Sequence, residues 1–287
     1  MKRFWCAFFM FWPIVAVILC WIAPGQNWWF PRGPSGTGAA MSPLGERIDD
    51  LFYMILMITS VTFVGTQVAL GYVLFTGARR SDTSHDAEGA EKTWFTHGSH
   101  NLEVMWSIVP AAVLLFIALY QMEVWAEYRV KDKFPEEVRK GPQAEVTARQ
   151  FEWRIRYPGL DENGNPLELM PDPQPTDLYT VNDLHLTSGE PVMIWLRSED
   201  VQHSFFLPEL RVKQDAVPGL VIPVWFEATK STEYSLLCAE LCGWGHYKMK
   251  ARLVAEREED RLVWLQELQA AQNDDGVPDA GDASDDE

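Results

Sequence analysis

Cysteine is scarce in this chain, which has 4 cysteines among 287 residues. Two of them, Cys6 and Cys20, lie in an apolar run, where a free thiol behaves as a small hydrophobic group. None belongs to a Cys-x-x-Cys-His sequence, so this sequence offers no site for covalent attachment of a c-type haem. The long apolar runs contain no histidine, which leaves no imidazole ligands for a haem inside a membrane.

Basic residues are also few, with 24 Lys and Arg against 41 Asp and Glu, for a net charge of −17. This balance argues against nucleic acid as a partner and suits a basic protein partner, because opposite charges speed encounter. The segment 273–287 has seven acidic residues and no basic one, which predicts an acidic disordered tail.

Three apolar runs dominate the first half of the chain, at 4–23, 51–76 and 104–124. Each approaches or exceeds the roughly 20 residues that a helix needs to cross a bilayer. The second and third runs predict a two-helix membrane anchor. The first run follows Lys2 and Arg3 and has no clean small-x-small cleavage site, so it is either a signal peptide or an extra transmembrane helix.

Basic residues near the ends of the runs set the expected orientation, because cytoplasmic loops are enriched in Lys and Arg. The start of the chain and the loop that contains Arg79, Arg80 and Lys92 are predicted to be cytoplasmic, so the second half lies outside. The expected organisation is a signal peptide or extra helix at 1–24, an anchor at 25–128 with helices at about 51–77 and 104–125, an external domain at 129–272, and the acidic tail at 273–287.

The second half of the chain has the pattern of an all-β sandwich. Apolar and polar residues alternate from 146 to 157, which predicts one strand. Further short strands separated by turn residues are predicted at 183–187, 192–196, 221–228 and 232–238. A helix at 256–272 closes the domain.

Four soft or borderline metal ligands lie within twelve residues, and a further imidazole, His203, lies 35 positions before the first of them. The four are Cys238, Cys242, His246 and Met249. A disulfide would leave both histidines and the methionine without a role, and one zinc ion would leave the methionine idle. Two copper ions that share two bridging thiolates would use all five side chains, so copper is favoured over zinc and a disulfide.

Several motifs in a fixed order resemble subunit II of cytochrome c oxidase over roughly residues 45–270. They are Glu103-Val-Met-Trp106-Ser-Ile-Val-Pro110, Ser198-Glu-Asp-Val-Gln-His203-Ser-Phe, Lys213-Gln-Asp-Ala-Val-Pro-Gly219 and Cys238-Ala-Glu-Leu-Cys242-Gly-Trp-Gly-His246-Tyr-Lys-Met249. The resemblance implies two transmembrane helices, or three if the first run is retained, followed by a cupredoxin-like sandwich with a C-terminal helix.

The resemblance also implies a binuclear copper centre, called CuA in this family. In that centre, Cys238 and Cys242 bridge the two ions. His203 and Met249 would complete one copper. The second copper would be completed by His246 and the backbone carbonyl of Glu240, whose side chain would also hold a magnesium ion shared with subunit I.

Other family positions imply roles in electron and proton transfer. The family passes electrons through an aromatic segment, and here Phe151 replaces the usual tryptophan while Trp153 is retained. Trp244, inside the ligand loop, is a hypothetical substitute. By the same resemblance, cytochrome c would dock at Glu199 and Asp200, and Glu103 would open a proton pathway into subunit I.

The function implied is transfer of electrons from cytochrome c to haem in subunit I, for oxygen reduction coupled to proton translocation. Subunits I and III, cytochrome c and membrane lipid would be its partners. The expected location is a bacterial inner membrane with the CuA domain in the periplasm, or alternatively the mitochondrial inner membrane. Two rival functions are a CuA subunit of a haem-copper nitric oxide reductase and a membrane-tethered copper-binding protein.

Overall fold

The computed structural model describes residues 2–23, 25, 26, 28, 40–83 and 98–274. The chain divides into two compact units, one formed by Met1–Phe30 with Ile48–Ala126 and the other by Pro31–Arg47 with Glu127–Glu287, and each is described by itself. Most of the predicted cytoplasmic loop, including Lys92, and nearly all of the predicted acidic tail lie outside the described residues.

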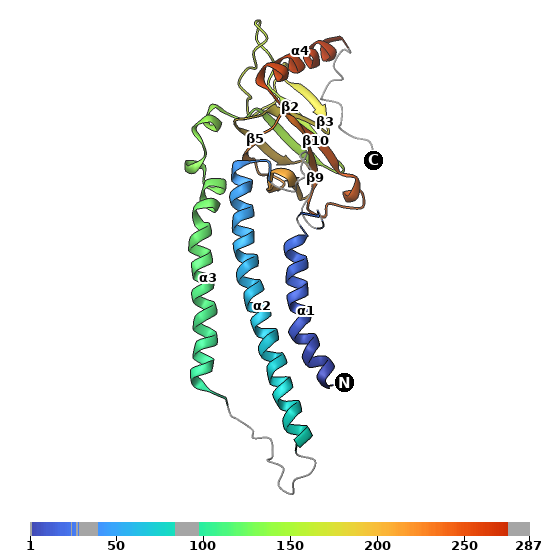
Figure 1. Cartoon of the computed structure of the whole chain (residues 1–287). Helices are drawn as coiled ribbons and strands as arrows, with labels where there is room; N and C mark the ends of the chain where they lie inside the picture. Colours follow the sequence, from blue (N-terminus) through green and yellow to red (C-terminus); the bar gives the residue numbers. More distant parts are fainter. Residues whose placement is uncertain (1, 24, 27, 29–39, 84–97, 275–287) are drawn as a thin grey trace. The chain divides into compact units, whose positions relative to one another are not determined.

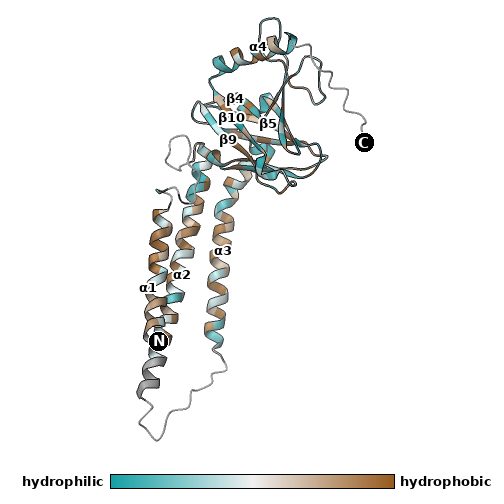
Figure 2. Cartoon of the chain, turned by 90° about the vertical axis from the view of Figure 1, so that its right-hand side faces the viewer, coloured by the Kyte–Doolittle hydropathy of each residue, from teal (hydrophilic) through white to brown (hydrophobic). Residues whose placement is uncertain are grey.

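The first unit is built from three long helices, α1 Lys2–Ile22, α2 Pro43–Thr83 and α3 His100–Arg129 (Figure 1). The first turns of α2 and the last turn of α3 are assigned to the second unit. All three contain segments long and apolar enough to cross a membrane. Hydrophobic residues recur along most of each helix in Figure 2. The helices expected at 51–77 and 104–125 lie within α2 and α3, which extend further at both ends.

The first apolar run forms α1, which packs against α2. At Gly71 the helices approach so closely that an added Cβ would lie 2.6 Å from Cγ of Met10. Nearer the other end of α1, the rings of Trp21 and Tyr53 lie 5.9 Å apart. Small residues permit this close approach between membrane helices. Removal of the run as a signal peptide stays a prediction.

The second unit is a sandwich of two five-stranded sheets. The first sheet has the order β3-β2-β1-β5-β8, with β1 Ala144–Arg149, β2 Glu152–Tyr157, β3 Leu178–Val181, β5 Pro191–Ser198 and β8 Ile222–Glu227. The second has the order β4-β10-β9-β6-β7, with β4 Asp183–Thr187, β6 His203–Leu207, β7 Val212–Ala216, β9 Thr232–Cys238 and β10 Lys250–Glu256. The all-β sandwich predicted from the turn spacing is confirmed.

The core lies between the two sheets, where apolar side chains from both inner faces interlock. Trp153 of β2 and Phe205 of β6 are fully buried and meet edge to face with ring centroids 5.8 Å apart. Such aromatic pairs add about 0.5–1.5 kcal/mol beyond the apolar area that they bury. The pair joins the sheets beside the end of β9.

The single strand predicted at 146–157 is wrong, because the chain turns back at Gln150 and Phe151. Ala148 of β1 pairs with Trp153 of β2, so the two strands form a tight antiparallel hairpin. Neither turn residue is Gly, Pro, Asn or Asp, so no local signal marks the turn. Tertiary contacts stabilise it: the backbone N–H of Gln150 donates to Oδ2 of Asp200 at 2.8 Å.

Four strands were not predicted: β3, β6, β7 and β10. Of these, β6 matters most, because it begins at His203 and pairs with β9 through Phe205 opposite Cys238.

The helix expected at 256–272 is present as α4, Glu258–Asp274. Three acidic residues in its first turn favour the helix start, where the helix dipole is positive. The ring of Trp264 stacks on that of His185 in β4 at 3.7 Å between centroids, and Leu265 is buried. These contacts hold α4 against the sandwich, where it contacts β3 and β4.

Candidate metal centre

Strand pairing brings His203 and Cys238 together. Because Phe205 pairs with Cys238 and side chains alternate along a strand, His203, two residues before Phe205, lies on the same face of the sheet. Nδ1 of His203 is 3.9 Å from Sγ of Cys238, and the imidazole is fully buried. The 35 residues that separate the two positions in sequence therefore become one contact.

The loop between β9 and β10 folds back over the contact between His203 and Cys238. The backbone N–H of Cys238 donates to the carbonyl of Met249 at 3.2 Å, which closes the loop. Inside it, Sγ of Cys242 lies 3.9 Å from Sγ of Cys238 and 3.8 Å from Sδ of Met249. Nδ1 of His246 is 3.7 Å from Sγ of Cys242, so the five predicted ligands form one cluster.

One backbone oxygen also faces the cluster. The carbonyl of Glu240 lies 3.2 Å from Sγ of Cys238. The ligand atoms of His203, Cys238 and Cys242 all lie within 4.8 Å of one another. Binding of a metal ion requires several donor atoms close together. The donor groups of this cluster are two thiols, a thioether, two imidazoles and a carbonyl.

The glycines of the loop accommodate Phe151. An added Cβ at Gly245 would lie 2.4 Å from Cδ2 of Phe151, and one at Gly243 would lie 3.1 Å from the same ring. Gly243 also has a φ of +139°, which side chains disfavour. The ring of Phe151 thus fills the space that the two glycines leave, and the β1–β2 turn packs on the ligand loop.

A hydrogen-bonded chain supports the ligands from behind. Nε2 of His203 lies 2.8 Å from Oδ1 of Asp200, whose other oxygen accepts the N–H of Gln150. The side-chain amide of Gln150 donates to the carbonyl of Cys242 at 2.6 Å. Partners of this kind fix the orientation of a ligating histidine and raise its basicity.

The two thiols have opposite electrostatic environments. Burial acts to raise the pKa of Cys238, but hydrogen bonds, first among them the one with His203, outweigh it and lower the pKa to about 6. Burial raises the pKa of Cys242 to about 11, and the neighbouring Cys238 thiolate adds to the increase. At neutral pH one sulfur is therefore a thiolate, which is the form that binds metal, and binding of a metal would displace the second proton.

The donor set fits copper. Soft thiolate and thioether ligands favour copper, and imidazole suits it equally. A tetrahedral zinc site would leave the thioether of Met249 unused although it contacts the sulfur of Cys242. Both cysteines are free thiols in this structure.

The aromatic residues expected on the electron route occupy two different places. Trp153 is fully buried, with its ring 6.4 Å from that of His203. Trp244 is 78% exposed and meets the ring of Phe151 edge to face at 5.3 Å. Of the three aromatic residues expected on the electron route, Trp244 is the exposed one, and Phe151 connects its ring to the glycines of the ligand loop.

The two predicted docking carboxylates are both in contact with other groups. Glu199 lies 3.8 Å from both Arg149 and Arg154. Asp200 accepts hydrogen bonds from the backbone of Gln150 and Val201 in addition to its contact with His203. Glu103 lies in the other unit, exposed in the first turn of α3.

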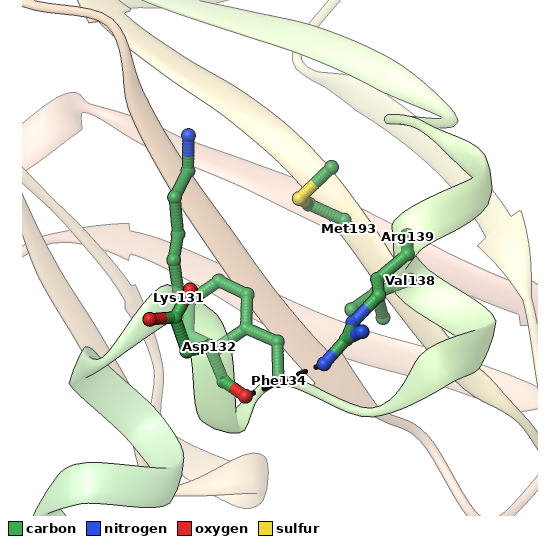
Figure 3. A pocket seen from close by; sticks show the side chains of 6 residues that line it. All are labelled: Lys131, Asp132, Phe134, Val138, Arg139 and Met193. Atoms are coloured by element: carbon green, nitrogen blue, oxygen red, sulfur yellow. Dashed lines mark hydrogen bonds between the residues drawn. The ribbon is translucent and has the colours of Figure 1, made fainter.

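A pocket of about 560 Å³ lies beside the segment that follows α3 (Figure 3). The guanidinium of Arg139 points across it toward the backbone oxygen of Asp132, at 3.3 Å. Its lining contains none of the predicted site residues and consists of Lys131, Asp132, Phe134, Val138, Arg139 and Met193. The metal cluster is therefore a separate site.

Sequence reasoning missed the supporting residues Gln150, Gly243 and Gly245. Gln150 stands directly before the aromatic position, and the glycines stand inside the ligand motif, so their places in the sequence were visible. Their roles were not, because each depends on the packing of the β1–β2 turn against a loop some 90 residues away.

Two family models match the chain. The one described as cytochrome c oxidase subunit II, periplasmic domain, matches residues 149–256, and the one described as cytochrome c oxidase subunit II, transmembrane domain, matches residues 35–124. Together they include every predicted copper ligand and both predicted anchor helices.

Curated proteins with the same description are similar over most of the chain. The alternative cytochrome c oxidase subunit 2 of Bradyrhizobium diazoefficiens is 29% identical over 276 residues, which cover 88% of this chain and 91% of that protein. Cytochrome c oxidase subunit 2 of Cereibacter sphaeroides is 26% identical over 258 residues, covering 82% and 80%. A crystal structure of the periplasmic domain of subunit II from Bradyrhizobium japonicum covers 45% of this chain and 93% of that one, with 22% identity and a TM-score of 0.37.

Apolar helices long enough to span a membrane, a cupredoxin-like sandwich and a sulfur and imidazole cluster that could hold a metal agree with the matched family models, which are those of a haem-copper oxidase subunit. The two family models and the curated relatives agree on which subunit. The chain belongs to the cytochrome c oxidase subunit II family.

Proposed function

We propose that this chain accepts electrons from cytochrome c at a binuclear CuA centre and passes them to haem in subunit I, for oxygen reduction coupled to proton translocation. The observation that carries the proposal is the convergence of five soft or borderline side chains and one carbonyl in a single cluster. When bound, two coppers would supply a one-electron relay whose charge is spread over both metals and both sulfurs.

Each ligand has a distinct position in the proposed centre. Cys238, at the end of β9, and Cys242, in the loop, would bridge the two ions. His203 would bind one ion through Nδ1, with Met249 on the same ion, while Asp200 holds the opposite ring nitrogen. The second ion would take His246 and the carbonyl of Glu240.

Glu240 has a second proposed role. Its carbonyl faces the cluster, and its side chain is partly exposed, so the carboxylate is free to reach a neighbouring subunit. We propose that it contributes a ligand to a magnesium ion shared with subunit I, since Mg²⁺ prefers oxygen ligands.

Electrons are proposed to enter through the Phe151–Trp244 pair. Trp244 is exposed and contacts Phe151, which packs on the glycines between Cys242 and His246. Trp153 is buried in the core next to His203, so we propose that it carries electrons inside the domain and does not contact the donor.

The remaining assignments complete an oxidase subunit. Glu103 would stand at the mouth of a proton pathway into subunit I, and Glu199 with Asp200 would dock cytochrome c. Subunits I and III and membrane lipid are the other proposed partners. We propose a bacterial inner membrane, with the metal domain in the periplasm, and the mitochondrial inner membrane is the alternative.

Copper content and electron paramagnetic resonance of the purified oxidase test the proposal. Two coppers per chain with a delocalised mixed-valence spectrum are expected. Met249→Leu should alter this spectrum, whereas Met170→Leu, at an exposed methionine outside the cluster, should not. One copper with a type 1 or type 2 spectrum, or a Cys238–Cys242 disulfide without copper, would instead indicate a membrane-tethered copper-binding protein.

Turnover by the assembled complex distinguishes an oxidase from the remaining alternative, a haem-copper nitric oxide reductase. An oxidase consumes oxygen with reduced cytochrome c, whereas a nitric oxide reductase consumes nitric oxide and leaves the oxygen rate at background. Both complexes would show the same copper spectrum, so the substrate decides.

A further inference from the structure

The pocket beside the segment that follows α3 has no part in the proposed electron transfer, yet its lining suits a ligand (Figure 3). Its volume of about 560 Å³ lies within the range of roughly 300–1,000 Å³ that is typical of small-molecule sites. Half of the lining is apolar and consists of Phe134, Val138 and Met193. The other half is charged and consists of Lys131, Asp132 and Arg139. A ligand with a charged part joined to an apolar part would match this division.

The apolar floor of the pocket is fixed by packing. Phe134 lies between the short helices η2 Lys131–Lys133 and η3 Glu136–Lys140, and its buried ring is 6.1 Å from that of Trp225 in β8. Nε1 of Trp225 in turn donates to the carbonyl of Glu127, in the last turn of α3, at 3.1 Å. The floor is therefore ordered before any ligand arrives, which reduces the entropy lost on binding.

The charged groups of the pocket are accessible. Arg139 reaches across it, with Nη2 3.3 Å from the backbone oxygen of Asp132 and Nη1 2.9 Å from Oε1 of Glu136, and other N–H donors of the guanidinium stay open. The ammonium of Lys131 extends away from Phe134 in Figure 3 and makes no ion pair with any residue in the described part of the chain. The carboxylate of Asp132 is exposed.

Chain length places the pocket close to the membrane surface. The membrane-spanning helix α3 ends at Arg129, and Lys131 follows two residues later, so at most about 7 Å of backbone separates them. Trp125, near the end of α3, is exposed, and tryptophan is enriched at the membrane–water interface. The headgroup layer extends about 5–7 Å beyond the apolar layer on each side. The segment that lines the pocket therefore begins at the level of lipid headgroups.

The charges of the pocket balance. The cations Lys131 and Arg139 are matched by the carboxylates of Asp132 and of Glu136, which pairs with Arg139. Such a set has no net charge and favours a ligand that carries both signs over one that is only anionic, because each charge then meets its opposite. Arginine and lysine are the usual partners of phosphate, and a carboxylate accepts hydrogen bonds from an ammonium group.

We propose that this pocket binds the headgroup of a zwitterionic aminophospholipid from the leaflet on the side of the metal domain. Lys131 and Arg139 hold the phosphate, Asp132 holds the ammonium, and the glycerol part rests on the apolar floor. The inference rests on the proposed function, in which membrane lipid is a partner, and deepens it by naming the headgroup and its site.

Photo-cross-linking in native membranes tests the proposal. The photoreactive residue p-benzoylphenylalanine in place of Met193 should attach to phospholipid on irradiation, and mass spectrometry should show the added mass of phosphatidylethanolamine. The same residue in place of Met170, an exposed methionine outside the lining, is the matched control. Lipid adducts no more frequent at position 193 than at position 170 would overturn the proposal. So would an adduct with another subunit, since protein would then fill the pocket.

Charge variants made in the cross-linking protein test the phosphate contacts. Lys131→Gln and Arg139→Gln should each lower the yield of lipid adduct about fivefold, as expected when one cation near the membrane surface is removed. Lys133→Gln and Lys140→Gln, which change neighbouring cations outside the lining, should leave the yield unchanged. Because Arg139 also contacts its own segment, Lys131→Gln is the decisive variant, and an unchanged yield in it would refute the phosphate site.

A choice between two lipids tests the contact with the ammonium. In bilayers that contain equal amounts of phosphatidylethanolamine and phosphatidylglycerol, the purified oxidase should give mostly the phosphatidylethanolamine adduct, and Asp132→Asn should lose this preference. Equal adducts in the unchanged protein would overturn the headgroup assignment. Excess inorganic phosphate should not suppress the adduct. Suppression would show that the pocket takes free phosphate and would overturn the lipid assignment.

Two further measurements distinguish failure of this inference from failure of the proposed function. If the chain resists alkaline extraction from membranes and the binuclear copper spectrum is present, but position 193 gives no lipid adduct, the inference alone is wrong. If alkaline extraction releases the chain, or if no binuclear copper spectrum forms, the proposed function is wrong.

Discussion

The carboxylate of Asp200 holds the imidazole of His203 from the side opposite the metal cluster. Oδ1 of Asp200 is 2.8 Å from Nε2, while Nδ1 of the same ring faces Sγ of Cys238. The ring is thereby fixed in one orientation with Nδ1 available as a ligand. Burial acts to lower the pKa of His203, but the hydrogen bonds with Cys238 and then Asp200 outweigh it and raise the pKa. The contact with His203 lowers the pKa of Asp200, against the effect of burial. Asp200 is therefore a positioning residue for a proposed ligand.

Asp200→Asn is expected to weaken copper binding without removing any ligand. The amide keeps the shape of the side chain but loses the charge that supports the imidazole, and such changes cost about 10–100-fold in metal affinity. Competition with a copper chelator measures the affinity, and the hyperfine pattern of the spectrum reports the altered His203. Glu199→Gln is the control, since the carboxylate of Glu199 forms ion pairs with Arg149 and Arg154 and not with a proposed ligand. Equal affinity in both variants would contradict the assignment.

Gly245→Ala is expected to disturb the ligand loop. The added Cβ would lie 2.4 Å from the ring of Phe151, which must then move. Overpacking of this kind costs about 1–3 kcal/mol, so the unfolding midpoint should fall and copper occupancy with it. Combining the change with Phe151→Ala removes the clash and should restore part of the stability. A double variant that is as unstable as the sum of the single variants would show that the two residues do not interact.

The two thiols of the metal-free protein are expected to react at different rates. Because the pKa of Cys238 is lowered to about 6 and that of Cys242 is raised to about 11, only Cys238 is mostly thiolate at pH 7. Alkylation followed by mass spectrometry should label Cys238 first, with a rate that rises through about pH 6 and then levels off. Burial of Cys242 acts in the same direction. Equal labelling at pH 7 would contradict the electrostatic difference.

Glu103→Gln tests the proposed proton pathway. An amide cannot take up and release a proton, so oxygen turnover should fall several-fold while the copper spectrum and the rate of copper reduction by cytochrome stay at wild-type values. Glu123→Gln, on the same helix, is the matched control. Normal turnover in the Glu103 variant would reject a role for this carboxylate in proton uptake.

Much of the molecule could be predicted from local patterns. The three apolar helices, the sandwich and α4 follow from run length, alternation and helical spacing, which depend only on neighbours in the sequence. The ligand residues could be named because four of them share one short loop. Their convergence could not be derived locally, since His203 reaches Cys238 only through the pairing of β6 with β9.

The β1–β2 turn was missed for the same reason. Its residues Gln150 and Phe151 have no turn propensity. The turn is stabilised by the hydrogen bond from Gln150 to Asp200 and by packing of the Phe151 ring over Gly243 and Gly245. The same contacts give Gln150 and Asp200 their supporting roles. At this turn, the local rule fails because of packing against the metal loop, which agrees with the view that such failures gather at functional sites.

Trp244 is expected to carry electrons as well as to contact the donor, and its substitutions separate the two roles. Trp244→Ala should keep the copper spectrum, because the side chain points to solvent and is not a proposed ligand. It should lower the rate at saturating cytochrome in addition to the second-order constant, whereas Trp244→Phe, which retains an aromatic ring next to Phe151, should recover most of the saturating rate. If Trp244 only shields the copper from water, Trp244→Ala would change the spectrum or the stability of the site and leave the saturating rate intact. A variant with an unaltered spectrum and the full saturating rate would remove Trp244 from the electron route and leave only its contact role to be measured.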